Sequence, residues 1–173
     1  SYKLGERVIV IGAGNAAMDV ARTAIRKGVR RLTCFSITKE VAASQYEFSY
    51  ATLEGVEFEY NKRPVEIKDN GVIFRDGSFT DVDGSDTLYE SDSVIISISQ
   101  GPMTRLVNST KGLNANKRGL LEADETGHTS RPGIFASGDV VNGARTVVEA
   151  VAHSKIVAES MHEYMQSLKD TTD

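Results

Sequence analysis

The most constraining feature of this sequence is a β-branched run that ends in a glycine turn and continues into a helical pattern. The run covers residues 7–11, and four of its five residues are Val or Ile. Such a run is typical of a strand buried on both faces of a parallel sheet. From Asn15 the apolar residues recur at helical spacing until Gly28, and residues 31–36 then predict a second strand. The segment therefore predicts a strand–helix–strand unit with a right-handed crossover.

The turn between this strand and this helix has the pattern GxGxxA. Gly12 permits a tight turn, Gly14 leaves room for a pyrophosphate to approach the backbone, and Ala17 lets the helix pack closely on the strand. The free N–H groups at the start of the helix favour an anion. Because the motif directly follows a strand and opens a helix, we expect dinucleotide binding. The alternatives are a glycine-rich turn that binds nothing and a site for another adenosine ligand.

The end of the second predicted strand bears on the choice between NAD and NADP. A chain that prefers NAD usually has an acidic residue there, which holds the ribose hydroxyls and would repel a 2′-phosphate. This chain has Ser36, Thr38 and Lys39, and no acid before Glu40. We therefore expect NADP slightly ahead of NAD. An ordinary solvated loop lysine explains Lys39 equally well.

The middle of the chain predicts a small antiparallel sheet inserted into the parallel one. Residues 44–53 have the pattern of a second helix, and residues 56–60 have that of a third strand. Three short strand patterns follow, at residues 65–68, 72–75 and 87–90. Hairpin and loop residues separate them, which favours an antiparallel β-meander. Residues 94–98 restore a buried parallel strand, so the meander forms a crossover, and the nucleotide-binding domain covers residues 1–103.

The rest of the chain, residues 104–173, predicts a connecting segment and part of another domain. Residues 104–132 are rich in Asn, Gly, Lys and Thr, with one short strand at residues 120–121. A strand remnant follows at residues 134–136. Residues 146–168 then have an apolar stripe at helical spacing. This part contains a strand, a loop and a long helix without a sheet of its own.

Gly138 and Asp139 follow the strand remnant directly. A glycine there lets the backbone approach a ligand, and the Asp139 carboxylate can accept hydrogen bonds from sugar or ribityl hydroxyls. The next helix begins near Thr146, and its N-terminus can support negative charge on a flavin ring. Taken alone, an ordinary Asx turn explains the pair equally well.

Composition excludes several classes of function. The 173 residues carry a formal charge of −4, and their Lys and Arg residues are scattered, which argues against a nucleic-acid or membrane surface. The single cysteine, Cys34, excludes an internal CxxC pair and a cysteine-ligated iron–sulfur cluster. The three histidines lack partners at metal-ligand spacing. No signal peptide or membrane span is predicted, which favours a cytoplasmic location.

Three stretches of the chain together resemble one protein family. They read VIVIGAGNAAMDVART, VIISISQGP and GIFASGDVVNGARTVVEAVAHSKIVAESM. They are similar to the small (beta) subunit of glutamate synthase and related flavin reductases of the pyridine nucleotide-disulfide oxidoreductase superfamily. The resemblance implies an α/β fold: a Rossmann-type NAD(P)-binding domain with a meander crossover, then the C-terminal segment of an FAD-binding domain. The family's first FAD-binding half is not among these residues, so the chain corresponds to a portion of a larger reductase.

The resemblance also assigns site residues. Those implied to surround the NAD(P) pyrophosphate are Gly12, Gly14, Asn15, Ala16 and Ala17. Those implied to border the nicotinamide half are Ser99 and Gln100. Those implied to meet FAD are Gly138, Asp139, Thr146, Val147 and Val148. No side chain need act as an acid or base, because hydride passes directly from nicotinamide to flavin. Where the family typically has an arginine pair after the second strand, this chain has Ile37 and Thr38.

The implied function is that of an NAD(P)H-dependent flavoprotein oxidoreductase domain, which transfers hydride from NAD(P)H to FAD. It would pass electrons to a larger partner subunit or another centre. The alternative is a non-catalytic, NAD(P)-sensing regulatory module. A disulfide reductase is a third interpretation, and the lack of a CxxC pair counts against it. We expect the chain alone to bind FAD poorly and to be inactive.

Overall fold

The computed structural model of the chain describes residues 3–81 and 83–170. Its internal contacts divide the chain into two compact units, Ser1–Ser99 and Gln100–Asp173. In the described parts of the chain, the first unit contains the strands of both sheets, and the second contains three helices joined by loops.

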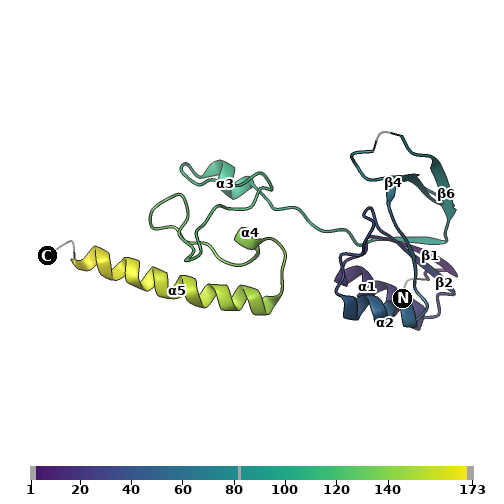
Figure 1. The fold of residues 1–173 in the computed structure, drawn as a ribbon, viewed down its shortest axis with the longest axis horizontal. Helices are drawn as coiled ribbons and strands as arrows, with labels where there is room; N and C mark the ends of the chain where they lie inside the picture. Colours follow the sequence, from purple (N-terminus) through teal and green to yellow (C-terminus); the bar gives the residue numbers. More distant parts are fainter. Residues whose placement is uncertain (1–2, 82, 171–173) are drawn as a thin grey trace. The chain divides into compact units, whose positions relative to one another are not determined.

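The first unit is built on a four-stranded parallel sheet with the order β3-β2-β1-β7 (Figure 1). The strands are β1 (Arg7–Ile11), β2 (Arg31–Phe35), β3 (Glu57–Glu59) and β7 (Ser93–Ile96). They lie where the sequence predicts them, although β3 and β7 are shorter than expected. β1 is central because its apolar side chains are buried on both faces, as a continuous β-branched run requires.

Two helices cover one face of this sheet, α1 (Asn15–Arg26) and α2 (Gln45–Leu53). The small residues Ala17 and Ala21 are fully buried in a cluster with Val10, so α1 packs directly on β1. An ion pair between Arg22 on α1 and Glu47 on α2, at 2.9 Å, joins the two helices. The helix predicted after the glycine turn is therefore confirmed.

An antiparallel sheet covers the other face, with the order β4-β5-β6 (Figure 1). Its strands are β4 (Lys62–Lys68), β5 (Gly71–Asp76) and β6 (Asp86–Glu90). The rings of Phe35 on β2 and Phe74 on β5 stack with their centroids 3.9 Å apart, and both are buried. The predicted meander between two strands of the parallel sheet is therefore confirmed.

The second unit contains α3 (Arg105–Ser109), α4 (Asp139–Asn142) and α5 (Val147–Asp170). Its small apolar core includes Val107 of α3 and Val141 of α4. The strand predicted at residues 120–121 is wrong, because Leu121 forms only an isolated bridge with Ala115. A turn at Asn116–Gly119 ends the pairing there, since the Gly119 N–H donates to the Asn116 carbonyl. The strand remnant at residues 134–136 is likewise one bridge, between His128 and Phe135.

The long helix α5 is confirmed, but its apolar stripe is exposed within this unit. Val151 and Met165 are half exposed, whereas Val157 and Ser160 are buried. Tyr164 contacts Phe135 edge to face. The helix therefore packs on the rest of the second unit through the face that carries Val157, Ser160 and Tyr164, and not through the predicted apolar stripe. None of the helices in the described parts of the chain combines the length and apolar character that crossing a bilayer requires.

Candidate functional site

The turn between β1 and α1 depends on a close backbone contact at Gly12. Gly12 has φ +125°, which side chains rarely adopt, and a Cβ there would lie 2.1 Å from the carbonyl oxygen of Ser97. Its N–H donates to the Phe35 carbonyl at 2.9 Å, and Ser97 donates to the Ile11 carbonyl at 2.8 Å. These contacts bring the ends of β1, β2 and β7 together at one edge of the sheet. Such an edge, at the carboxyl ends of parallel strands, is where open α/β sheets bind ligands.

Gly14 has a different role from Gly12. It has φ −89° and precedes the first residue of α1, and no atom lies within 4 Å of the position that its Cβ would occupy. No side chain caps α1, and its first turn contains no acidic residue. Asn15 and Ala16, the first residues of α1, are both exposed. The helix therefore presents free N–H groups and the positive end of its dipole to open space, which is the arrangement that binds a phosphate group.

The loop after β2, residues 36–44, lies against this turn. The N–H of Ser44 donates to Asn15 Oδ1 at 2.8 Å, and the N–H of Ala43 donates to the Ala13 carbonyl at 2.9 Å. The structure thus brings the predicted ribose-binding loop to the predicted pyrophosphate-binding turn.

Within this loop the predicted hydroxyl groups bind one another. Ser36 Oγ and Thr38 Oγ1 are 3.0 Å apart, and they lie 3.1 Å and 2.6 Å from the Glu40 carbonyl oxygen. Because each hydroxyl has one hydrogen, one of them donates to this carbonyl while it accepts the hydrogen of the other. Ser36 is buried, whereas Lys39 is exposed. The hydroxyls of Ser36 and Thr38 therefore shape the loop. Lys39 is the predicted residue of this loop that offers an accessible positive charge.

The predicted nicotinamide-side residues follow β7. Ser99 is the last residue of the first unit and Gln100 the first of the second, and both are exposed. The contact of Ser97 with Gly12 places the start of this segment beside the glycine turn.

The predicted FAD-contacting residues surround α4 and the start of α5. Gly138 has φ +74° and directly precedes α4, whose first residue is Asp139. Asp139 is exposed, and its Oδ1 accepts a hydrogen bond from the Arg145 N–H at 3.3 Å. The carboxylate is therefore held beside the loop that leads into α5, with its second oxygen available to a ligand hydroxyl.

The start of α5 has a capping box that the sequence analysis missed. The N–H of Thr146 donates to Glu149 Oε2 at 3.0 Å, and the N–H of Glu149 donates to Thr146 Oγ1 at 3.3 Å. The Thr146 hydroxyl also donates to Glu149 Oε2, at 2.7 Å, and this bond first, followed by that from the Thr146 N–H, lowers the pKa of the Glu149 carboxyl. The pattern T-x-x-E was the available signal. Val147 and Val148 lie between these two residues and are 79% and 77% exposed, so they are accessible to a flat ring.

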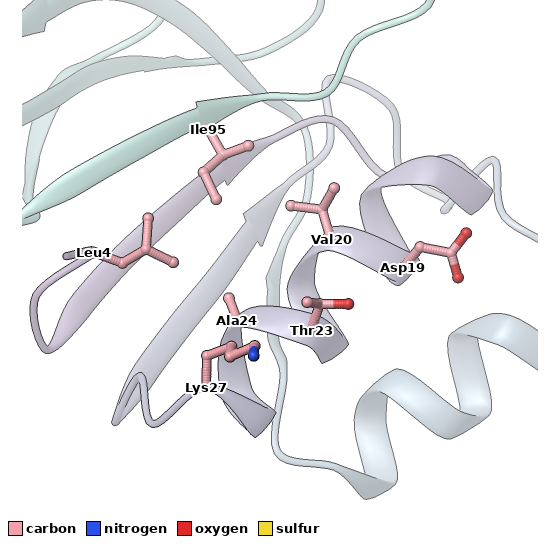
Figure 2. Close-up of a pocket in the computed structure, with 7 residues that line it drawn as sticks. All are labelled: Leu4, Asp19, Val20, Thr23, Ala24, Lys27 and Ile95. Atoms are coloured by element: carbon pink, nitrogen blue, oxygen red, sulfur yellow. The ribbon is translucent and has the colours of Figure 1, made fainter. Parts of the chain in front are cut away.

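An open apolar groove of about 310 Å³ lies elsewhere in the first unit, between α1 and the edge strand β7 (Figure 2). Its lining residues are Leu4, Asp19, Val20, Thr23, Ala24, Lys27 and Ile95. None of the predicted site residues is among them. Because nucleotide recognition needs several convergent polar groups, the glycine turn is the better candidate site.

Residues 1–154 match the family model described as pyridine nucleotide-disulphide oxidoreductase. The chain belongs to this family. The resemblance drawn from the glycine turn and the Gly138–Asp139 segment is thereby confirmed.

Individual proteins are similar to nearly the whole chain. The glutamate synthase [NADPH] small chain of Escherichia coli (strain K12) is 30% identical over 94% of this chain and 39% of its own length. The beta subunit of the NADP(+)-dependent formate dehydrogenase of Moorella thermoacetica is 33% identical over 94% of this chain and 25% of its own length. The chain thus spans well under half of these relatives.

A solved structure supports the same mixed α/β fold, with parallel and antiparallel sheets. Thioredoxin reductase from T. acidophilum matches with a TM-score of 0.79 and 25% identity, over 95% of this chain and 54% of its own length.

The single cysteine of this family member is expected to be unreactive. Cys34 is fully buried in β2, and burial raises the pKa of its thiol to about 12. Because the thiolate is the nucleophile, a thiol reagent at pH 8 should modify the folded chain very slowly. Addition of urea should give rapid modification of one thiol per chain. Rapid reaction before unfolding, measured with a chromogenic disulfide, would show that β2 is exposed or unstable.

Proposed function

We propose that the first unit is a Rossmann-type domain that binds NAD(P)H at the turn between β1 and α1. The observation that carries this proposal is the pairing of two glycines with different roles. Gly12 has no room for a side chain, whereas Gly14 faces open space beside an uncapped helix N-terminus. A glycine-rich turn with no ligand would not need the open side at Gly14. The proposed domains are residues 1–103 for NAD(P)H and residues 104–173 for the connecting segment and part of an FAD-binding domain.

In this proposal the chain positions two cofactors and supplies no acid or base. FAD, when bound, supplies the acceptor for a hydride from the nicotinamide. Gly12, Gly14, Asn15, Ala16 and Ala17 hold the pyrophosphate of NAD(P)H. Ser99 and Gln100 border its nicotinamide. Gly138, Asp139, Thr146, Val147 and Val148 contact FAD through one carboxylate, backbone groups and two exposed apolar side chains.

We propose NADP as the preferred coenzyme. The related glutamate synthase small chain is named for NADPH, and the formate dehydrogenase subunit is named for NADP(+). In this chain the loop after β2 has no acid before Glu40, and Lys39 is exposed to meet a 2′-phosphate. Ser36, which is buried, and Thr38, which is exposed, help to shape the loop through their mutual hydrogen bond.

We also propose an electron-accepting partner. The relatives are named as a small chain and as a beta subunit, which are parts of larger assemblies. A larger subunit that takes electrons from FAD fits a chain whose own residues supply positioning only.

The capping box favours a second candidate, a module that senses NAD(P) without redox work. The Glu149 carboxylate offsets the positive end of the α5 dipole, which would otherwise stabilise negative charge on a reduced flavin. The two candidates differ in whether NADPH, added to the complete protein with FAD, bleaches the flavin absorption. A sensor binds the coenzyme and leaves the flavin oxidised.

Calorimetric titration of the purified chain with NADPH, NADH and FAD, each alone, tests the proposed coenzyme site. We expect one NADPH per chain, weaker NADH binding, and no stoichiometric binding of FAD. Binding of neither coenzyme would contradict the proposal for the first unit. Stoichiometric FAD binding would contradict the expectation that the second unit supplies only part of the FAD site.

A further inference from the structure

Asn15 connects the glycine turn to the loop after β2. We infer that Asn15 is a positioning residue that holds the adenosine-side loop, residues 36–44, in place for the coenzyme. The inference rests on the proposed coenzyme site and adds a specific role for one side chain. Asn15 is the first residue of α1, but its side chain does not cap that helix.

The side chain of Asn15 instead turns toward the neighbouring loop. Its Oδ1 accepts the N–H of Ser44 at 2.8 Å, across 29 positions of the sequence. The N–H of Ala43 reaches the Ala13 carbonyl at 2.9 Å, so two adjacent hydrogen bonds attach the end of the loop to the glycine turn. Of these two, the bond to Asn15 is the one that a side-chain substitution can remove.

Ser44 is also a structural boundary. It is the N-cap of α2, and its Oγ accepts the N–H of Glu47 at 3.3 Å. The other end of the loop is fixed where the N–H of Lys62 donates to the Ser36 carbonyl at 2.9 Å. Asn15 therefore holds the C-terminal end of the loop, at Ser44, whereas β4 of the meander holds its N-terminal end, at Ser36.

The amide group of Asn15 has a second capacity. Its oxygen is engaged by Ser44, and no hydrogen bond from its Nδ2 occurs among the described residues of the chain, while Asn15 itself is exposed. An asparagine Nδ2 has two donors, which are suited to a phosphate oxygen. One side chain can thus fix the adenosine-side loop through its oxygen and contact the pyrophosphate through its nitrogen.

Two substitutions separate these roles. Asn15→Asp keeps an acceptor for the Ser44 N–H, but removes the donors and places a negative charge beside the pyrophosphate. Asn15→Ala removes both the acceptor and the donors. Asn108→Ala, in the second unit, is a matched control for the loss of an exposed asparagine.

The probe for the loop alone is a ligand without pyrophosphate. Adenosine 2′-monophosphate serves if the wild-type chain prefers NADPH, and adenosine serves if it prefers NADH. We expect Asn15→Ala to weaken the probe about three- to tenfold, as loss of one hydrogen bond predicts. Asn15→Asp should bind the probe as the wild type does. Both variants should bind the whole coenzyme more weakly.

Amide hydrogen exchange at Ser44 gives an independent measurement. Exchange should be faster in Asn15→Ala and unchanged in Asn15→Asp and Asn108→Ala. Equal weakening of the probe by both Asn15 variants, or by neither, would overturn the positioning role. So would a wild-type chain that binds the coenzyme but not the probe. If the wild type binds no coenzyme, the proposed function itself fails, and this inference fails with it.

Discussion

Replacing Gly14 with valine is expected to weaken NAD(P)H binding by at least about 100-fold, because excluding a pyrophosphate from its amides removes several charge-assisted hydrogen bonds. The fold should tolerate the change. Gly14 has φ −89°, and no atom lies within 4 Å of its Cβ position. The cost in unfolding free energy should be at most about 1–2 kcal/mol, the usual range for a poor N-cap residue.

Calorimetric titration measures the affinity of this variant, and urea unfolding followed by circular dichroism measures its stability. Gly14→Ala provides a graded control, since its smaller side chain should reduce affinity less than valine does. Wild-type affinity in Gly14→Val would mean that the coenzyme does not approach this turn.

Gly12→Ala, unlike Gly14→Val, is expected to lose much of the stability of the fold. The variant combines an unfavourable φ of +125° with a Cβ 2.1 Å from the Ser97 carbonyl oxygen. Backbone strain and overpacking together should lower the free energy of unfolding by about 2–6 kcal/mol. The ends of β1 and β7 would have to separate to relieve the contact.

Gly55→Ala is the matched control for this prediction. Gly55 has a similar φ of +94°, but nothing lies within 4 Å of its Cβ position. It should show the strain alone, about 1–3 kcal/mol. If urea unfolding gives the same loss for both variants, the contact between Gly12 and Ser97 does not constrain the fold.

The sequence predicted the first unit well because its elements have strong local patterns. The β-branched run of β1 and the helical spacing of α1 each have one simple explanation. The second unit was harder, because α3 and α4 have only five and four residues and show no periodicity. Leu120 and Leu121 are apolar and buried, yet the backbone at Leu121 forms an isolated bridge with Ala115 and not a strand.

In the candidate site, the backbone conformation could be predicted from the glycine motif. The hydrogen-bond partners of the side chains could not. The tight turn at Gly12 and the open backbone at Gly14 could be predicted from the order of the motif alone. The sequence could not show that Ser36 and Thr38 bind each other, or that Asn15 reaches Ser44. Asn15 and Ser44 are far apart in the sequence, and Ser36 and Thr38 are close together in a loop without a regular pattern. In both cases the folded loop brings the partners together. Glu149 was missed although its capping pattern is local.

The central claim is that NAD(P)H binds at the glycine turn between β1 and α1. Its most direct test is the change in amide chemical shifts of the isotopically labelled chain when NADPH is added. We predict the largest changes at Gly12, Gly14, Asn15 and Ala16, with smaller changes along the loop after β2. Saturable changes confined to other parts of the chain, with these amides unmoved, would contradict the account.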